Sequence, residues 1–151
     1  PATEGVGYMT TDQYNILNGT SLAASGVIAK YTYLGDANLD GKITADDFAQ
    51  IDASYLKDTS GTTTGFHWIN GDFNYDGKIT SADFALIDAA YTAQGSPLAA
   101  GIVAGDMARF AGTDFAAQYQ VALSAAGAVP EPASLGLLAL GAVSLLARRR
   151  R

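Results

Sequence analysis

The chain has 151 residues, a formal net charge of −6 and a hydrophobic share of 48%, which together allow one modest folded domain with additional segments. It contains no cysteine and only one histidine, which excludes disulfides, thiolate metal centres and His-rich zinc sites. Four of the nine basic residues stand together at 148–151, so the rest of the chain is strongly acidic, which favours a cation as partner and argues against nucleic acid.

Two short elements are predicted first. Residues 8–17 have a threonine cap and apolar residues at helical spacing, which predicts a short helix that ends at Asn18-Gly19. Residues 27–34 are β-branched and aromatic, which predicts one strand. Because the chain opens with Pro1 and no signal-peptide pattern, we expect residues 1–34 to be the end of an upstream domain.

One segment then occurs twice, at an offset of 36 residues. Between residues 35–57 and 71–93, 15 of 23 positions are identical, which indicates an internal duplication. We therefore expect residues 35–93 to form one module built from two similar halves.

Each copy begins with D-x-N-x-D-G, the opening pattern of a twelve-residue calcium loop. A calcium ion takes roughly six to eight oxygen ligands, and alternate loop positions supply most of them. Glycine at position 6, Gly41 or Gly77, allows the left-handed backbone that the sharp turn needs. One ion is expected in each loop. The predicted ligands are Asp36, Asn38, Asp40, Lys42 through its backbone carbonyl, Thr44 and Asp47, and in the second copy Asp72, Asn74, Asp76, Lys78 through its carbonyl, Thr80 and Asp83.

A helix is predicted after each loop, because Thr44 with Asp47 and Thr80 with Asp83 form T-x-x-D capping boxes. An apolar stripe at helical spacing follows in both copies, and it has two interpretations: a partner surface, or packing of the two helices on each other, which is favoured. Trp68 is expected to fill the space between the copies.

Residues 94–128 are rich in alanine and glycine and are expected to be a loosely ordered linker, in which one helix is interrupted by Gly112. The tail combines three features in order. Val129, Pro130, Glu131 and Pro132 precede an uncharged apolar run over 133–147, and four arginines follow. The run predicts a hydrophobic, membrane-anchoring helix, although its 15 residues are fewer than the roughly 20 of a comfortable span. The arginines would keep the end of the chain on the cytoplasmic side.

The duplicated loops resemble a type I dockerin domain over about residues 35–93. The resemblance rests on D-x-N-x-D-G-K-I-T in both copies, one exiting helix per loop, and aspartate at position 12 where EF-hands have glutamate. It implies a mainly α, EF-hand-like module that binds two calcium ions, folds on binding them and docks onto a cohesin-like module in extracellular carbohydrate-degrading assemblies. It also implies partner contacts at loop positions 10 and 11, which are Ala45, Asp46, Ser81 and Ala82.

The tail, residues 129–151, resembles a PEP-CTERM sorting signal. That resemblance implies a protein exported by a Gram-negative-type bacterium, held transiently in the inner membrane and cleaved near Pro-Glu-Pro by an exosortase. The released protein would stay at the cell surface or in the extracellular matrix.

The leading functional prediction is a non-catalytic, calcium-dependent interaction module of an exported, surface-sorted protein, with polysaccharide degradation as one setting. Two alternatives stay open: a purely structural, calcium-rigidified end of a large surface protein, or the accessory tail of an upstream glycoside hydrolase. No enzyme activity is expected from these residues, because the carboxylates are assigned to metal and His67 has no base–nucleophile arrangement around it.

Overall fold

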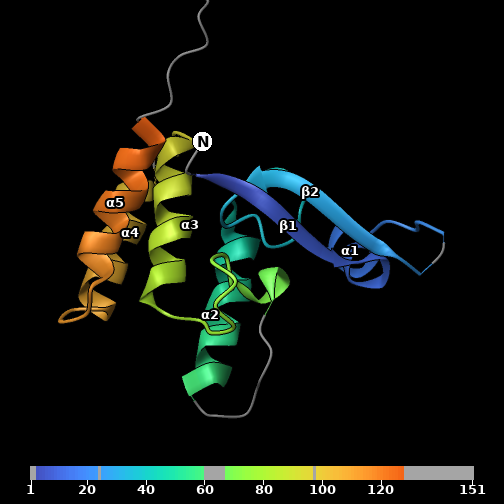
Figure 1. The fold of residues 1–151 in the computed structure, drawn as a ribbon, viewed down its shortest axis with the longest axis horizontal. Helices are drawn as coiled ribbons and strands as arrows, with labels where there is room; N and C mark the ends of the chain where they lie inside the picture. Colours follow the sequence, from blue (N-terminus) through green and yellow to red (C-terminus); the bar gives the residue numbers. More distant parts are fainter. Residues whose placement is uncertain (1–2, 24, 60–66, 97, 128–151) are drawn as a thin grey trace, which may run out of the picture.

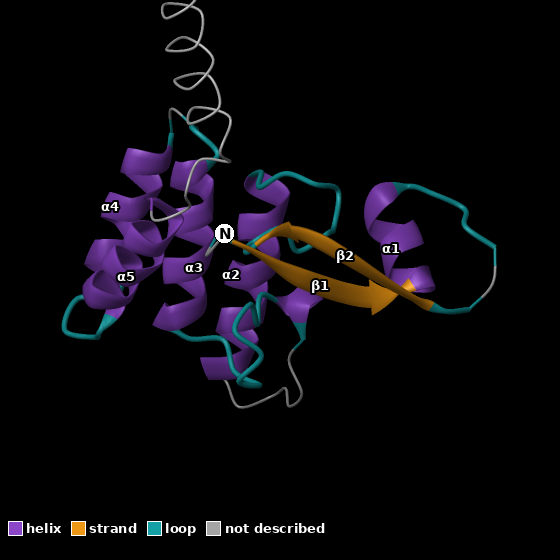
Figure 2. Cartoon of the chain, turned by 45° about the horizontal axis from the view of Figure 1, so that its top comes forward, coloured by secondary structure: helices purple, strands orange, loops and turns teal. Residues whose placement is uncertain are grey.

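The computed structural model describes residues 3–23, 25–59, 67–96 and 98–127. Within these ranges the chain forms five α-helices, one 3-10 helix and a two-stranded sheet (Figures 1 and 2). The elements are β1 (Glu4–Thr10), α1 (Thr11–Asn18), β2 (Val27–Tyr33), α2 (Ala45–Thr59), the 3-10 helix η1 (Trp68–Asn70), α3 (Ser81–Ala93), α4 (Ala99–Arg109) and α5 (Phe115–Gly127).

The helical content agrees with the predicted mainly α class. The structure also contains a small two-stranded sheet. Among the described helices, none has the length and apolar character needed to cross a membrane. The predicted C-terminal hydrophobic helix lies outside the described residues.

The N-terminal part is an antiparallel ribbon of β1 and β2 that extends away from the helices (Figure 1). Strand β2 confirms the strand predicted over 27–34. The helix predicted over 8–17 begins only at Thr11, because the residues before it pair with β2 as part of β1. Thr10 caps α1 through a capping box with Gln13, and Gly19 ends the helix in a left-handed conformation at φ 61°.

Strand β1 packs on the duplicated module. A side chain at Gly7 would place its Cβ 2.5 Å from the Trp68 ring, so only glycine allows this approach. The hydroxyl of Tyr75 donates to the carbonyl oxygen of Val6 at 2.6 Å, and the rings of Tyr8 and Tyr75 stack with centroids 5.7 Å apart. The ribbon thereby shares its core with the loops, and its assignment to an upstream domain stays a prediction.

Helices α2 and α3 pack on each other in opposite directions. Phe48, near the start of α2, meets Tyr91, near the end of α3, with ring centroids 5.3 Å apart. Tyr55 and Phe84 make the reciprocal contact at 5.6 Å. The interpretation of the apolar stripe as mutual packing is confirmed.

The same reciprocity appears at the glycine that precedes each loop. A Cβ at Gly35 would lie 2.5 Å from Ile87 of the other copy, and a Cβ at Gly71 would lie 2.6 Å from Ile51. Both glycines also have positive φ, 126° and 99°, which disfavours any larger residue. The two copies are therefore related by an approximate two-fold axis between α2 and α3.

Trp68 occupies the junction between the copies and is fully buried. Its Nε1 donates to the carbonyl oxygen of Asp36 in the first loop at 2.7 Å. Its ring meets Phe73 and Tyr75 of the second loop, with centroids 5.3 and 5.7 Å away. The predicted place of Trp68 is confirmed.

The expected loose order over 94–128 was wrong, whereas the predicted interruption of a helix at Gly112 is confirmed. The described part of this region contains two helices, α4 and α5, joined through Gly112 at φ 86°. Phe110, Phe115 and Tyr119 are buried at 5%, 1% and 7% exposure, and α5 runs beside α3 (Figure 1). The high alanine content favours order here, because small side chains let helices approach closely.

Candidate calcium-binding site

The two predicted loops have almost the same backbone hydrogen bonds. In the first loop, the Asp36 carboxylate accepts from the backbone N–H of Asp40 at 3.0 Å and of Gly41 at 2.8 Å. In the second loop, Asp72 accepts from the equivalent N–H groups at 3.1 and 3.0 Å. The carboxylate at position 1 thus organises each turn from inside.

Two left-handed residues bend each loop. Position 4 is Leu39 at φ 60° or Tyr75 at φ 61°, and position 6 is Gly41 at φ 102° or Gly77 at φ 83°. Left-handed backbone is costly for leucine and tyrosine, so the surroundings must enforce it. For Leu39 the surroundings are clear: its side chain is fully buried and its carbonyl oxygen accepts from Lys30 Nζ at 2.8 Å.

The aspartate at position 12 closes each loop. Asp47 accepts from the N–H groups of Ala37 at 2.9 Å and Thr44 at 2.8 Å, so one carboxylate joins the beginning and the end of the loop. Asp83 does the same for Phe73 and Thr80, at 3.0 Å each. These contacts bring positions 1 and 12 together.

The capping boxes predicted from T-x-x-D are present in the way the sequence suggests. At α3, Thr80 and Asp83 form both halves of the box. At α2, the Thr44 N–H donates to Asp47, and the Thr44 hydroxyl oxygen accepts from the Asp46 N–H at 3.4 Å. Each position-12 aspartate therefore starts its helix as well as closing its loop.

Four carboxylates of the loops are removed from water. Asp36, Asp47, Asp72 and Asp83 have at most 1% exposure. Burial raises the pKa of Asp47 and Asp83 to about 6, and it also raises the pKa of Asp36 and Asp72. Within each loop the neighbouring acids raise these pKa values further. Lys30 lowers the pKa of Asp36 in part, but each loop still holds a pair of buried carboxylates, and a hard cation would supply the remaining positive charge.

The oxygen donors of each loop fit calcium if amide, hydroxyl and carbonyl oxygens join the carboxylates. In the described part of the chain, no group of three or more Asp, Glu, His or Cys side chains is placed to bind a metal ion without other ligands. An ion would therefore also use the Asn and Thr side chains and the carbonyl oxygen of Lys42 or Lys78, and it would draw in the exposed Asp40 or Asp76. All of these donors are oxygens, which is the chemistry that calcium prefers. The individual ligands stay a prediction.

Sequence reasoning missed the residues that hold each loop from the opposite copy. The side chain of Gln94, after α3, accepts from Ile43 N–H at 2.8 Å and donates to the Ile43 carbonyl oxygen at 3.1 Å. Asp58, near the end of α2, accepts from Ile79 N–H at 3.2 Å. Asp58 and Gln94 are themselves 36 residues apart, so the repeat spacing was the signal that could have identified them.

The predicted partner contacts do not form one surface. Ala45 and Asp46 are exposed at the start of α2, whereas Ser81 and Ala82 are half-buried at the start of α3. Because the two helices are antiparallel, these starts lie at opposite ends of the pair. Ser81 Oγ also donates to Gln118 Oε1 of α5 at 3.5 Å.

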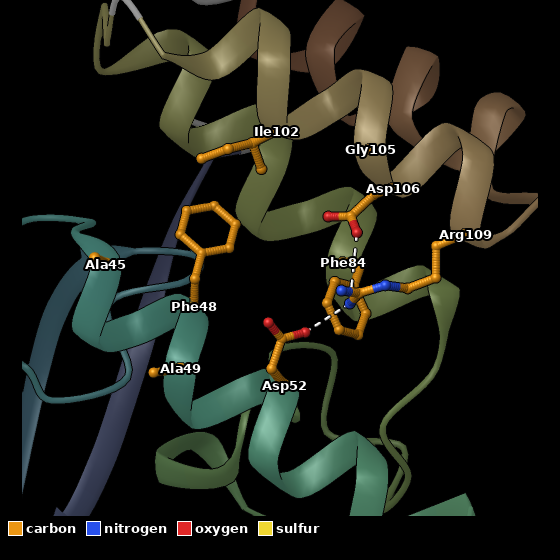
Figure 3. Close-up of a pocket in the computed structure, with 9 residues that line it drawn as sticks. All are labelled: Ala45, Phe48, Ala49, Asp52, Phe84, Ile102, Gly105, Asp106 and Arg109. Carbon is orange, nitrogen blue, oxygen red and sulfur yellow. Dashed lines mark hydrogen bonds and ion pairs between the residues drawn. The ribbon is translucent and has the colours of Figure 1, made fainter.

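An acidic cluster with one arginine lies between α2, α3 and α4. Arg109 of α4 pairs with Asp52 of α2 at 2.6 Å and with Asp106 at 3.5 Å (Figure 3). Asp88, the counterpart of Asp52 in the second copy, is fully buried, and neither of its carboxylate oxygens finds a hydrogen-bond partner among the described residues. Burial, reinforced by the charge of Asp106, raises the pKa of Asp88 to about 7.

Replacement of Asp88 by Asn should stabilise the protein at pH 7.5 but not at pH 4. In the unfolded chain this carboxyl ionises near pH 4, whereas in the folded protein it keeps its proton up to about pH 7. The wild-type contribution of Asp88 to stability therefore falls as the pH rises between these values and stays low above them. We expect a gain on the order of 2 kcal/mol at pH 7.5, measured by urea unfolding with calcium present.

Asp52→Asn is the matched control, because it changes the same repeat position where the side chain is 46% exposed. Its effect should stay below about 1 kcal/mol at both pH values, as for a surface ion pair. An equal effect of Asp88→Asn at pH 4 and pH 7.5 would contradict the assignment of a raised pKa to Asp88.

Comparison with known proteins agrees with both predicted resemblances. Residues 34–92 match the family model of the dockerin type I domain, and residues 128–151 match the model of the PEP-CTERM protein-sorting motif. No curated protein and no solved structure matched the chain. The first match contains both loops, α2, η1 and nearly all of α3, and it ends before α4. The second match lies outside the described residues.

Proposed function

We propose, from the premise that the chain carries a dockerin type I segment ahead of a PEP-CTERM motif, that it is a non-catalytic docking module of an exported protein. The module would bind a cohesin-like domain in a calcium-dependent manner. The observation that carries the proposal is the pair of near-identical loops, each with two fully buried carboxylates.

Calcium, when bound, would supply the positive charge that these carboxylates lack. The residues of the chain then explain why docking would depend on an ordered loop conformation. Asp47 and Asp83 close the loops and also form the first turns of α2 and α3, so a disordered loop would leave its helix start undefined. The proposed contact residues Ala45, Asp46, Ser81 and Ala82 all belong to these first turns.

The sorting motif supports export as the setting. Val129, Pro130, Glu131 and Pro132 would be the segment that an exosortase recognises, after a transient stay in the inner membrane. Retention at the cell surface or in the extracellular matrix of a Gram-negative-type bacterium is part of this proposal, as is a role in polysaccharide degradation through an upstream glycoside hydrolase.

A purely structural role is the second candidate. It is favoured by one observation: the contact residues of the second copy are half-buried beside α5 rather than presented to solvent. In this case the loops would only stiffen the chain in calcium-rich surroundings.

Affinity measurements with cohesin modules separate the two candidates. The full chain, immobilised with calcium present, should retain at least one cohesin module encoded in the same genome, and excess chelator should release it. Magnesium in place of calcium serves as control, because its smaller, octahedral coordination does not suit this type of loop. Failure of every module to bind the calcium-loaded chain would favour the structural role.

A further inference from the structure

We infer that the partner docks on helix α2 alone, because helix α5 of the same chain already occupies the corresponding face of α3. This inference rests on the proposed docking function and names the surface that serves it. It follows from comparing equivalent positions of the two copies, which the 36-residue offset defines.

Equivalent alanines have opposite environments in the two helices. Ala85 and Ala89 of α3 are buried, with 1% and 0% exposure. Their counterparts in α2, Ala49 and Ala53, are exposed. The residue type is the same in both copies, so the difference comes from what packs on the helix and not from the sequence of the helix itself.

Helix α5 is what covers α3. At the start of α3, the Ser81 hydroxyl donates to Gln118 of α5. Near the other end of α3, the Thr92 hydroxyl lies 3.3 Å from the Tyr119 hydroxyl of α5. Phe115 and Tyr119 are buried in this contact region, together with Ala122. The contact thus extends along most of α3, and a partner could reach that face only by displacing α5.

No equivalent helix lies on the outer face of α2 in the described structure. Helix α4 leaves a groove of about 480 Å³ against α2, across which Arg109 reaches Asp52 (Figure 3). A second hollow of about 360 Å³, lined by Leu17 and Asp46 among others, lies on the other side. Ala49 lines both hollows, so it marks the centre of an open surface.

The chemistry of this surface specifies the occupant. Its centre is made of small apolar residues, Ala45, Ala49 and Ala53, and Asp46 and Asp52 stand at its edges. It therefore suits a protein face with an apolar patch and a cationic side chain placed to meet Asp46. A second copy of this chain is a poor occupant, because its own α2 face carries the same negative charges and its net charge is also −6.

Single cysteines test both parts of the inference, since the chain has no native cysteine. The variants are Ala49→Cys and Ala53→Cys on α2, with Ala85→Cys and Ala89→Cys as matched positions on α3. The rate of thiol labelling is measured in the full, calcium-loaded chain, with and without the cohesin module that binds the wild type. Circular dichroism confirms that each variant is folded, and two positions per helix protect the test against one variant that fails to fold.

We expect the α2 cysteines to react at least about 100-fold faster than the α3 cysteines, because labelling a buried site requires local opening. Bound cohesin should slow labelling of the α2 cysteines at least about tenfold and leave the α3 rates unchanged. Equal rates on the two helices without partner would overturn the covering by α5. Cohesin that binds without protecting α2 would overturn the docking surface but not the proposed function. Absence of any cohesin binding would remove the proposed function and this docking surface with it, and protection at high protein concentration without cohesin would point to a second copy.

Discussion

Replacement of Asp47 or Asp83 by alanine should abolish calcium binding in the affected loop and lower the free energy of unfolding by about 3–5 kcal/mol with calcium present. Each carboxylate is fully buried, and it accepts three backbone N–H groups at Asp47 and two at Asp83 that would be left without acceptors. The carboxylate also ties the start of the loop to the first turn of its helix. One substitution would therefore remove a proposed ligand, a loop closure and a helix cap together.

Calorimetric titration with calcium and urea unfolding check this prediction. The two variants should each lose one of the expected sites and keep the other. Asp12→Ala, an exposed aspartate in the first turn of α1, is the control and should change stability by less than about 0.5 kcal/mol. Wild-type stoichiometry and affinity in Asp47→Ala or Asp83→Ala would contradict the role of position 12.

The loop region could be predicted from the sequence because its determinants are local. Glycine at position 6 and aspartate at positions 1 and 12 each act within their own twelve residues, so the pattern was sufficient to place the turns and the helix starts. The packing of α2 on α3 also followed, because an apolar stripe present in both copies is most simply buried by the two stripes meeting, but their antiparallel direction did not.

A helix interrupted at Gly112 was predicted for the region of α4 and α5, but the packing of these helices on the module could not be predicted in the same way. Their packing depends on the small residues Ala85 and Ala89 of α3, which let α5 approach, and on buried aromatic residues such as Phe115 and Tyr119. None of these contacts is visible in a stretch that looks like an alanine- and glycine-rich linker. The same limit applies to Asp52 and Asp88. They are identical residues at equivalent positions, but Asp88 is buried and Asp52 is partly exposed because α4 and α5 pack mainly on α3.

Strand β1 was missed for a related reason. Its glycines weaken the local strand signal, and one of them, Gly7, is needed because the Trp68 ring lies against it. The long-range contact that explains the glycine joins residues far apart in the chain. Sequence patterns within one window do not contain that information.

Removal of calcium should unfold the loops and expose Trp68. Without the ion, the buried carboxylates of each loop would repel one another and take up water, which the folded loop excludes. Calcium that binds only the folded state would add about 4 kcal/mol per site when its free concentration is about 1,000 times the dissociation constant. A small module of this size would not be expected to stay folded after losing that contribution at two sites.

Trp68 gives the most direct test of calcium-dependent folding. It is the only tryptophan in the sequence, it is fully buried, and its Nε1 donates to the carbonyl oxygen of the proposed ligand Asp36. The measurement is Trp68 fluorescence of the full chain during heating, with calcium and with excess chelator. We predict a blue-shifted emission and one cooperative transition with calcium, and a red-shifted emission without a transition in chelator. The same spectrum and the same melting temperature in both conditions would contradict a calcium-dependent module.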